Sequence, residues 1–181
     1  MGNLFDAERL QDVLTNGTTD AVARVLADLR EALQVACDAA VEALSREETQ
    51  IVVAEALAEI GTIAVPRLRI FMSDDNQPEG ARDIAGILLL QFGDNSGVPR
   101  LTKAISTGSE WGVLAARKLS AMKNESAAPA IAQRLAQDID NADEIVALLD
   151  ALHTLDETSF DRIATKYRHG SWPETVRASA R

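Results

Sequence analysis

The stretch ALAEIGTIAVPRL, residues 56–68, contains the pattern that decides the fold. An apolar helix ends there in a short loop, and a new helix starts on a hydrophobic residue followed by proline. The pattern returns in LLLQFGDNSGVPRL at 88–101 and in LSAMKNESAAPAI at 119–131, while LHTLDETSFDRI at 152–163 keeps the spacing without the proline. A unit that recurs about every 30 residues indicates a repeat protein.

Apolar residues on both sides of these loops recur at helical spacing. In the first helix of each unit, which follows a loop, they are Val65, Leu68, Met72; Val98, Leu101, Ile105; Ala128, Ile131, Leu135; and Phe160, Ile163, Tyr167, and upstream Cys37, Ala40 and Leu44 fit the same template. In the second helix, which precedes a loop, they are Val53, Leu57, Ile60; Ala85, Leu89, Phe92; Ala115, Leu119, Met122; and Leu148, Leu152, Leu155. Nothing alternates with period two. We therefore predict an all-α fold of about five helical hairpins, without a sheet.

Proline and glycine mark the predicted helix boundaries. Pro66, Pro99 and Pro129 fall in the first turn of a helix, where the missing N–H removes no hydrogen bond. Gly61 and Gly93 fall where helices end, a position that favours left-handed backbone. Turn and N-cap residues between the two helices of a unit occupy 73–78, 106–109 and 138–141.

The 181 residues suit a single repeat domain, 1–181, with irregular ends. We expect N-terminal capping helices in 1–34, one closing at Asn16-Gly17 and the next starting near Thr19, and repeats in 35–165. Residues 166–181 form the predicted C-terminal cap, with a turn at Gly170-Ser171-Trp172-Pro173 and one short helix. Stacked repeats need such caps because an end unit must cover its apolar face. Helix boundaries within 19–60 are not set by the sequence, since that range contains no Gly or Pro.

Composition narrows the classes of partner. The chain is 46% hydrophobic, too apolar for a disordered protein, and has one cysteine and a net charge of -10. No apolar run approaches the roughly 20 residues of a membrane span, and no secretory signal is visible, so we expect a cytoplasmic protein that does not bind membranes. Residues 1–160 carry 26 Asp and Glu against 13 Lys and Arg. This acidic body excludes nucleic acid as the expected partner and favours a basic protein.

The repeat pattern resembles the HEAT-like repeats of bacteria, including the variety also found in phycobilin lyases. The resemblance covers roughly residues 35–165 and rests on helix spacing, the glycine loop and the Val-Pro start. One unit keeps the arginine that the family often places early in the second helix, at Arg82. The resemblance implies a right-handed α-solenoid whose second helices line a concave surface that binds another protein.

No motif indicates catalysis, so we expect no enzyme activity, no cofactor and no metal. His153 and His169 lack metal-ligand spacing, and Cys37 occupies a core position. The acidic runs 73–76 and 94–96 are interpreted as helix caps, because neither has the spacing of a calcium loop. We expect Trp111 to pack between units, and Trp172 to cover the last unit.

The candidate site is the outward face of the second helices. Glu55, Ile87, Arg117 and Asp150 hold equivalent positions on it, and Leu90 and His153 hold an adjacent row. Ile87 and Leu90 lie in an apolar run wider than one buried stripe, which predicts either an exposed contact patch or burial by the curvature of the array. The predicted partner-binding residues are Glu55, Glu59, Ile87, Leu90, Arg117, Asp150 and His153.

Three functions agree with this pattern. The favoured one is a non-enzymatic module that binds a partner protein along a concave surface. A second is an accessory or chaperone protein, similar to the bilin lyases, that acts on a tetrapyrrole-bearing protein. A third is an acidic inhibitor or immunity-type protein that masks a basic effector.

Overall fold

The computed structural model describes residues 7–168 and 172–181. Within these ranges the chain is helical and contains no strand, which confirms the all-α prediction. The α-helices are α1 (Ala7–Asn16), α2 (Thr19–Ala43), α3 (Gln50–Ile60), α4 (Val65–Ser73), α5 (Glu79–Gln91), α6 (Val98–Thr107), α7 (Gly112–Ala121), α8 (Ala128–Ala136), α9 (Ala142–Leu155), α10 (Glu157–Arg168) and α11 (Glu174–Ser179). The 3-10 helices are η1 (Glu47–Thr49), η2 (Gly61–Ala64), η3 (Asn95–Gly97) and η4 (Glu125–Ala127).

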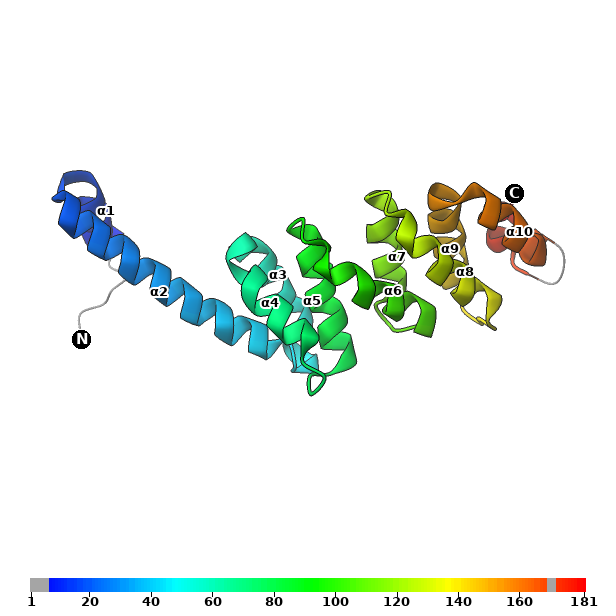
Figure 1. The fold of residues 1–181 in the computed structure, drawn as a ribbon, viewed down its shortest axis with the longest axis horizontal. Helices are drawn as coiled ribbons and strands as arrows, with labels where there is room; N and C mark the ends of the chain where they lie inside the picture. The colour runs from blue at the N-terminus through cyan, green and yellow to red at the C-terminus, as the bar shows by residue number, and fades with distance from the viewer. Residues whose placement is uncertain (1–6, 169–171) are drawn as a thin grey trace.

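The helices follow one another along the long axis of the molecule (Figure 1). From α2 onward the helices pack as consecutive pairs: α2 with α3, α4 with α5, α6 with α7, α8 with α9, and α10 with α11. Most helices of alternate number also pack side by side, as α6 with α8 and α7 with α9 do, whereas α4 contacts η3 more than it contacts α6. The even-numbered helices therefore form one layer and the odd-numbered helices from α3 to α11 form the other.

The prolines and glycines that were predicted to mark helix boundaries lie where helices begin and end. Pro66, Pro99 and Pro129 stand in the first turns of α4, α6 and α8. Gly61 and Gly93 have φ of 80° and 79°, in the region that favours glycine, and both predictions are confirmed. The loop after α7 has no glycine, and Lys123 takes the positive φ of 53° at the equivalent position. A short 3-10 turn precedes the proline in each loop, a detail that the sequence did not predict.

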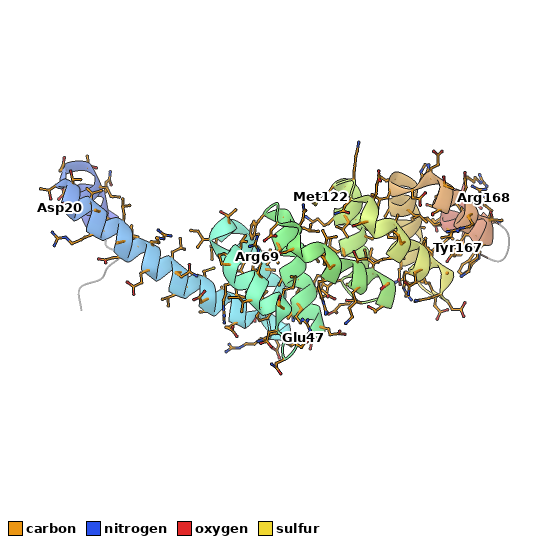
Figure 2. All side chains as sticks on the ribbon, in the orientation of Figure 1. Asp20, Glu47, Arg69, Met122, Tyr167 and Arg168 are labelled. Carbon is orange, nitrogen blue, oxygen red and sulfur yellow. The ribbon has the colours of Figure 1, made fainter. Side chains whose placement is uncertain are left out.

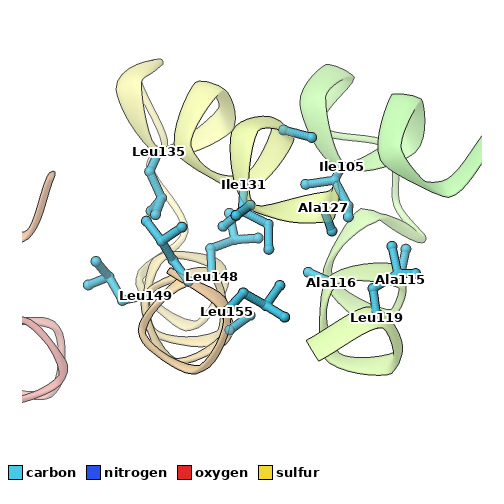
Figure 3. Close-up of a cluster of buried hydrophobic side chains, with 14 of the residues drawn as sticks. Ile105, Ala115, Ala116, Leu119, Ala127, Ile131, Leu135, Leu148, Leu149 and Leu155 are labelled. Atoms are coloured by element: carbon cyan, nitrogen blue, oxygen red, sulfur yellow. The ribbon is translucent and has the colours of Figure 1, made fainter. Parts of the chain in front are cut away.

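The buried side chains form two clusters. The larger one lies between the two layers from α5 to α11: Ile105 of α6 and Ile131 of α8 face Leu119 of α7 and Leu148 of α9 (Figure 3). The smaller cluster joins α2 to α5 and includes Cys37 and Leu57. Each fully buried leucine or isoleucine contributes about 1.5 to 3 kcal/mol of transfer free energy, so these clusters dominate the stability of the layers.

The first helix pair differs from the others, because α2 is 25 residues long. The boundary predicted at residue 35 falls inside this helix. Its N-terminal half, which carries Asp20, extends away from the layers, and α1 is the one described helix beside it (Figures 1 and 2). The range expected to cap the array therefore leaves Ile51 and Val52 of α3 exposed.

The C-terminal end is covered. The short helix α11, which the sequence predicted, packs against α9 and α10 and buries Val176 and Ala180. The buried Tyr167 hydroxyl donates a hydrogen bond to the Leu135 carbonyl at 2.7 Å. The end of the array is therefore closed by residues of the chain itself.

Candidate functional site

Ile87 and Leu90, the predicted apolar anchors, are buried, with 7% and 3% of their surface exposed. The helix that carries them, α5, is contacted by α3 and α4 on one side and by α6 and α7 on the other. Ile84 and Leu88 join the smaller cluster, whereas Ile87 and Leu90 join the larger one. The apolar run is wide because α5 connects two cores. The expectation that these two residues form an exposed contact patch is wrong.

A buried ion pair joins Asp83 of α5 to Arg100 of α6, and the sequence pattern did not predict it. The Asp83 carboxylate accepts hydrogen bonds from Arg100 Nε and from the Ser109 hydroxyl, both at 2.6 Å. Arg100 also donates to the Glu79 carbonyl at 3.0 Å. Every polar atom of Asp83 is thus satisfied within the chain, and its side chain is 1% exposed. The cluster holds α5, α6 and the loop before α7 together.

The other predicted site residues are exposed. Glu55 and Glu59 lie on α3, Arg117 lies on α7, and Asp150 and His153 lie on α9. Within the described parts of the chain, none of the four charged residues among them takes part in an ion pair. The His153 ring stacks on Phe160, with centroids 4.6 Å apart. These side chains are accessible, and whether they bind a partner stays a prediction.

A groove between α7 and α9 brings two of the predicted residues together. Arg117 and Asp150 line it with Lys123 and Thr154, and its volume is about 500 Å³. Small side chains complete its lining: Ser120, Ala121, Ala147 and Ala151. The groove is open to solvent and carries both signs of charge above an alanine floor. Such a surface fits a protein segment better than it fits an enclosed small molecule.

Glu55 and Glu59 do not line this groove. They lie on α3, and α5 separates them from α7 in the odd-numbered layer. Because α5 is buried over nearly all its length, the exposed face is interrupted there. The predicted row therefore divides into an acidic patch on α3 and a mixed-charge groove at α7 and α9.

A second groove lies in the other layer, between α8 and α10. Its volume is about 520 Å³, and Gln133, Asp156 and Arg162 are among the residues that line it. Hydrogen bonds from Ser159 hold the pKa of Asp156 below its usual range. Asp156 therefore caps the start of α10, which accounts for its position without a ligand.

The cysteine and the acidic runs that were considered as reactive or metal-binding sites have structural roles. Cys37 is buried, as predicted, and burial raises the pKa of its thiol while the neighbouring Asp38 carboxylate raises it further. Asp94 accepts a backbone hydrogen bond from Ser96 and caps η3, so the capping interpretation of 94–96 is confirmed. Asp74 accepts from the Asn76 N–H within the α4–α5 loop, and Pro78 holds the N-cap position of α5, so the run 73–76 stabilises a turn and does not cap a helix. No group of His, Cys, Asp or Glu side chains among the described residues is arranged to hold a metal ion. His169 lies outside the described residues.

Both tryptophans occupy the predicted positions. Trp111 packs against both clusters at the start of α7, and its indole N–H donates to Glu110 at 3.0 Å. Trp172 packs against the larger cluster and lies beside Tyr167, with ring centroids 5.2 Å apart. Trp111 thus lies between units and Trp172 covers the last one.

Comparisons of the chain with models of protein families, with curated proteins and with solved structures found no match. Among the described helices, none combines the length and the apolar character that crossing a membrane requires.

Proposed function

We propose that this chain is a non-enzymatic module, a HEAT-like right-handed α-solenoid that binds a partner protein along the face formed by α3, α7 and α9. The observation that carries this proposal is the lack of ion-pair partners for Glu55, Glu59, Arg117 and Asp150 among the described residues. In the other layer, arginines of α4, α6 and α8 are paired with carboxylates, as Arg134 is with Glu144 at 2.7 Å. These arginines are neutralised by neighbouring helices, whereas Glu55, Glu59, Arg117 and Asp150 remain available to a partner.

The repeated helix pairs support the solenoid. Alternate helices pack side by side over most of each layer, and three of the loops restart a helix on a first-turn proline. An array of this kind presents one layer of helices as an extended, rigid surface. Such a surface is preorganised, so little conformational entropy is lost when a protein binds.

The groove between α7 and α9 is the proposed contact centre. Arg117 and Asp150 at its rim discriminate among partners by charge, and the alanines below them allow a helix or loop to approach closely. Lys123 at one end adds a second cation. The partner segment therefore carries both an acidic and a basic group over a small apolar contact.

The acidic excess of the chain favours a partner that is basic overall. This also agrees with the alternative function, in which an acidic inhibitor or immunity-type protein masks a basic effector. The tetrapyrrole alternative has less support. Its thiol anchor requires an accessible, low-pKa cysteine, whereas the Cys37 thiol is buried and its pKa is raised.

The proposal is tested by placing a photo-reactive amino acid at Thr154, which is exposed and lines the α7–α9 groove. Irradiation in native lysate is expected to give one dominant cross-linked protein. The double charge reversal Arg117→Glu, Asp150→Lys should lower its yield at least fivefold, because both rim charges change sign.

The matched control carries the same photo-reactive group at Gln133, which is exposed in the groove of the opposite layer. That position should not capture the same protein. Circular dichroism must show unchanged helix content in every variant. Equal capture from both positions, or a yield unaffected by the charge reversal, would exclude the α7–α9 groove as the contact.

A further inference from the structure

The outward face of α3 is exposed at positions that neighbouring helices cover on α5 and α9. Val52 is 69% exposed, whereas the residues at the equivalent position are Ile84 at 3%, Leu114 at 37% and Ala147 at 4%. Ala56, one turn after Val52, is also exposed, whereas its equivalents Leu88 and Ala151 are buried. Neighbouring helices therefore cover this position on α5 and α9, Leu114 of α7 is partly exposed, and no described residue covers Val52.

The covered positions face the preceding unit. Ile84 and Leu88 of α5 belong to the cluster made with α2 to α4. Ala147 and Ala151 of α9 lie in the groove shared with α7. Val52 and Ala56 therefore occupy the side of α3 on which a preceding odd-numbered helix would pack, and the N-terminal half of α2 does not take that place.

The surroundings of this apolar face are acidic. Glu55 and Glu59 lie on the exposed side of α3, and Glu48 lies just before the helix. None of the three forms an ion pair within the described chain. An apolar strip beside unpaired carboxylates complements an amphipathic helix that carries lysine or arginine on its flank.

We infer that the exposed face of α3 binds an amphipathic α-helix of another protein, apolar on the side facing Val52 and Ala56 and basic beside Glu48, Glu55 and Glu59. The inference rests on the proposed protein-binding function and names a second contact and its chemistry. The incoming helix would extend the odd-numbered layer by one member and pack on α3 as α7 packs on α9. Helices in such layers lie about 8 to 10 Å apart, which small residues such as Ala56 allow.

A second copy of this chain fits the face less well. The chain carries a net charge of -10, so a copy would bring further carboxylates to an acidic surface. Its C-terminal end is closed by α11, where Arg177 and Arg181 are already paired with Glu174. Charge and closure both favour a basic partner of a different sequence.

The test uses the full chain and two synthetic peptides of about 18 residues, or five helical turns. One has a leucine and alanine face flanked by lysines, and the other replaces each lysine by glutamate. Fluorescence anisotropy measures binding, and amide hydrogen exchange locates it. We expect the lysine peptide to bind and to slow exchange in α3, and the glutamate peptide to bind at least tenfold more weakly.

The variant Val52→Lys should bind the lysine peptide at least tenfold more weakly than the unmodified chain does. The matched control Ile70→Lys replaces an apolar residue that is 60% exposed on α4 and should change the affinity less than twofold. Because both residues are exposed, neither change should unfold the protein. Glu55→Gln with Glu59→Gln should weaken binding and reduce its dependence on salt.

Three results would overturn the inference: equal binding of both peptides, an affinity unaffected by Val52→Lys, or concentration-dependent self-association that protects α3 without peptide. Each leaves the proposed function intact as long as cross-linking from Thr154 still depends on Arg117 and Asp150. Loss of that cross-link with normal peptide binding would instead remove the proposed groove and keep the α3 contact.

Discussion

The two ends of the helix array differ in whether the apolar face of the terminal repeat is covered. At the C-terminal end Trp172 lies over Tyr167, and α11 covers the open side of α9. At the N-terminal end Ile51 and Val52 of α3 face solvent. Both ends present an apolar face of a repeat, but among the described residues only the C-terminal end has added residues that cover it. Capping in this protein is therefore a property of the segments outside the repeat, not of the repeat itself.

The long helix α2 shows the same contrast within one element. Leu26 and Leu33 continue the stripe formed by Cys37, Val41 and Leu44, at helical spacing. The C-terminal part of the stripe is buried against α3 and α4, whereas Leu26 and Leu33 remain exposed. One amphipathic face thus contributes to a core only along the part where other helices reach it.

The largest effect is expected at the closed end. Tyr167→Ala removes a fully buried ring and its hydrogen bond to Leu135, and should lower the free energy of unfolding by about 4 kcal/mol. Urea unfolding followed by circular dichroism measures this change. Tyr167→Phe keeps the ring and should cost about 1 kcal/mol. A loss below 1 kcal/mol for the alanine variant would show that this end is not closed by packing.

A slightly smaller effect is expected where the two clusters meet. Asp83→Ala leaves the buried Arg100 without its main partner and should lower the free energy of unfolding by about 3 kcal/mol. This value is at the low end for a broken buried ion pair, because Arg100 keeps its contacts with Glu79. Hydrogen exchange should then show α2 to α4 opening before α8 to α11. Simultaneous opening of both regions would show that the two ends form one cooperative unit.

Acid should weaken the contact between α4 and the loop that contains η3. The hydrogen bond from Arg69 is the main reason that the pKa of Asp94 lies below its usual value, and Asp94 also caps η3. A lowered folded-state pKa stabilises the protein fully above the unfolded pKa of about 3.9, and this contribution is lost as the pH falls through the folded pKa.

Asp94→Ala should therefore cost about 1 kcal/mol at pH 7 and less as the pH falls below about 4. Asn124 caps η4 in the equivalent loop and does not titrate. Asn124→Ala is the matched control and should cost a similar amount at every pH, as thermal unfolding between pH 2 and 7 can measure. A pH-independent cost at Asp94 would contradict this assignment.

The smallest effect is expected at the open end. Leu26→Ala removes a half-exposed side chain from a helix with no covering neighbour and should change stability by less than about 0.5 kcal/mol. The control Leu152→Ala removes a fully buried leucine of α9 and should cost about 2 to 5 kcal/mol. A loss above 2 kcal/mol at Leu26 would show that another helix covers this face in solution.

Particular residues show why part of the candidate site could be predicted. Arg117 and Asp150 are two residues past a stripe position, so helical periodicity alone places them outside the core. The same rule failed for Ile87 and Leu90, because it assumes that each helix has one buried face. In α5 two cores lie on opposite sides. The buried partners of Asp83 could not be predicted either, since Arg100 and Ser109 come from other elements.

The sequence by itself determined the helices, their pairing order and their boundaries at proline and glycine, because these depend on local spacing and on backbone preferences of single residues. The tertiary structure decided which apolar faces are covered. Burial depends on which neighbour reaches a face, and that depends on residues distant along the chain. For this reason the apolar run at Ile87 became part of the core, while the equally apolar Val52 remained exposed.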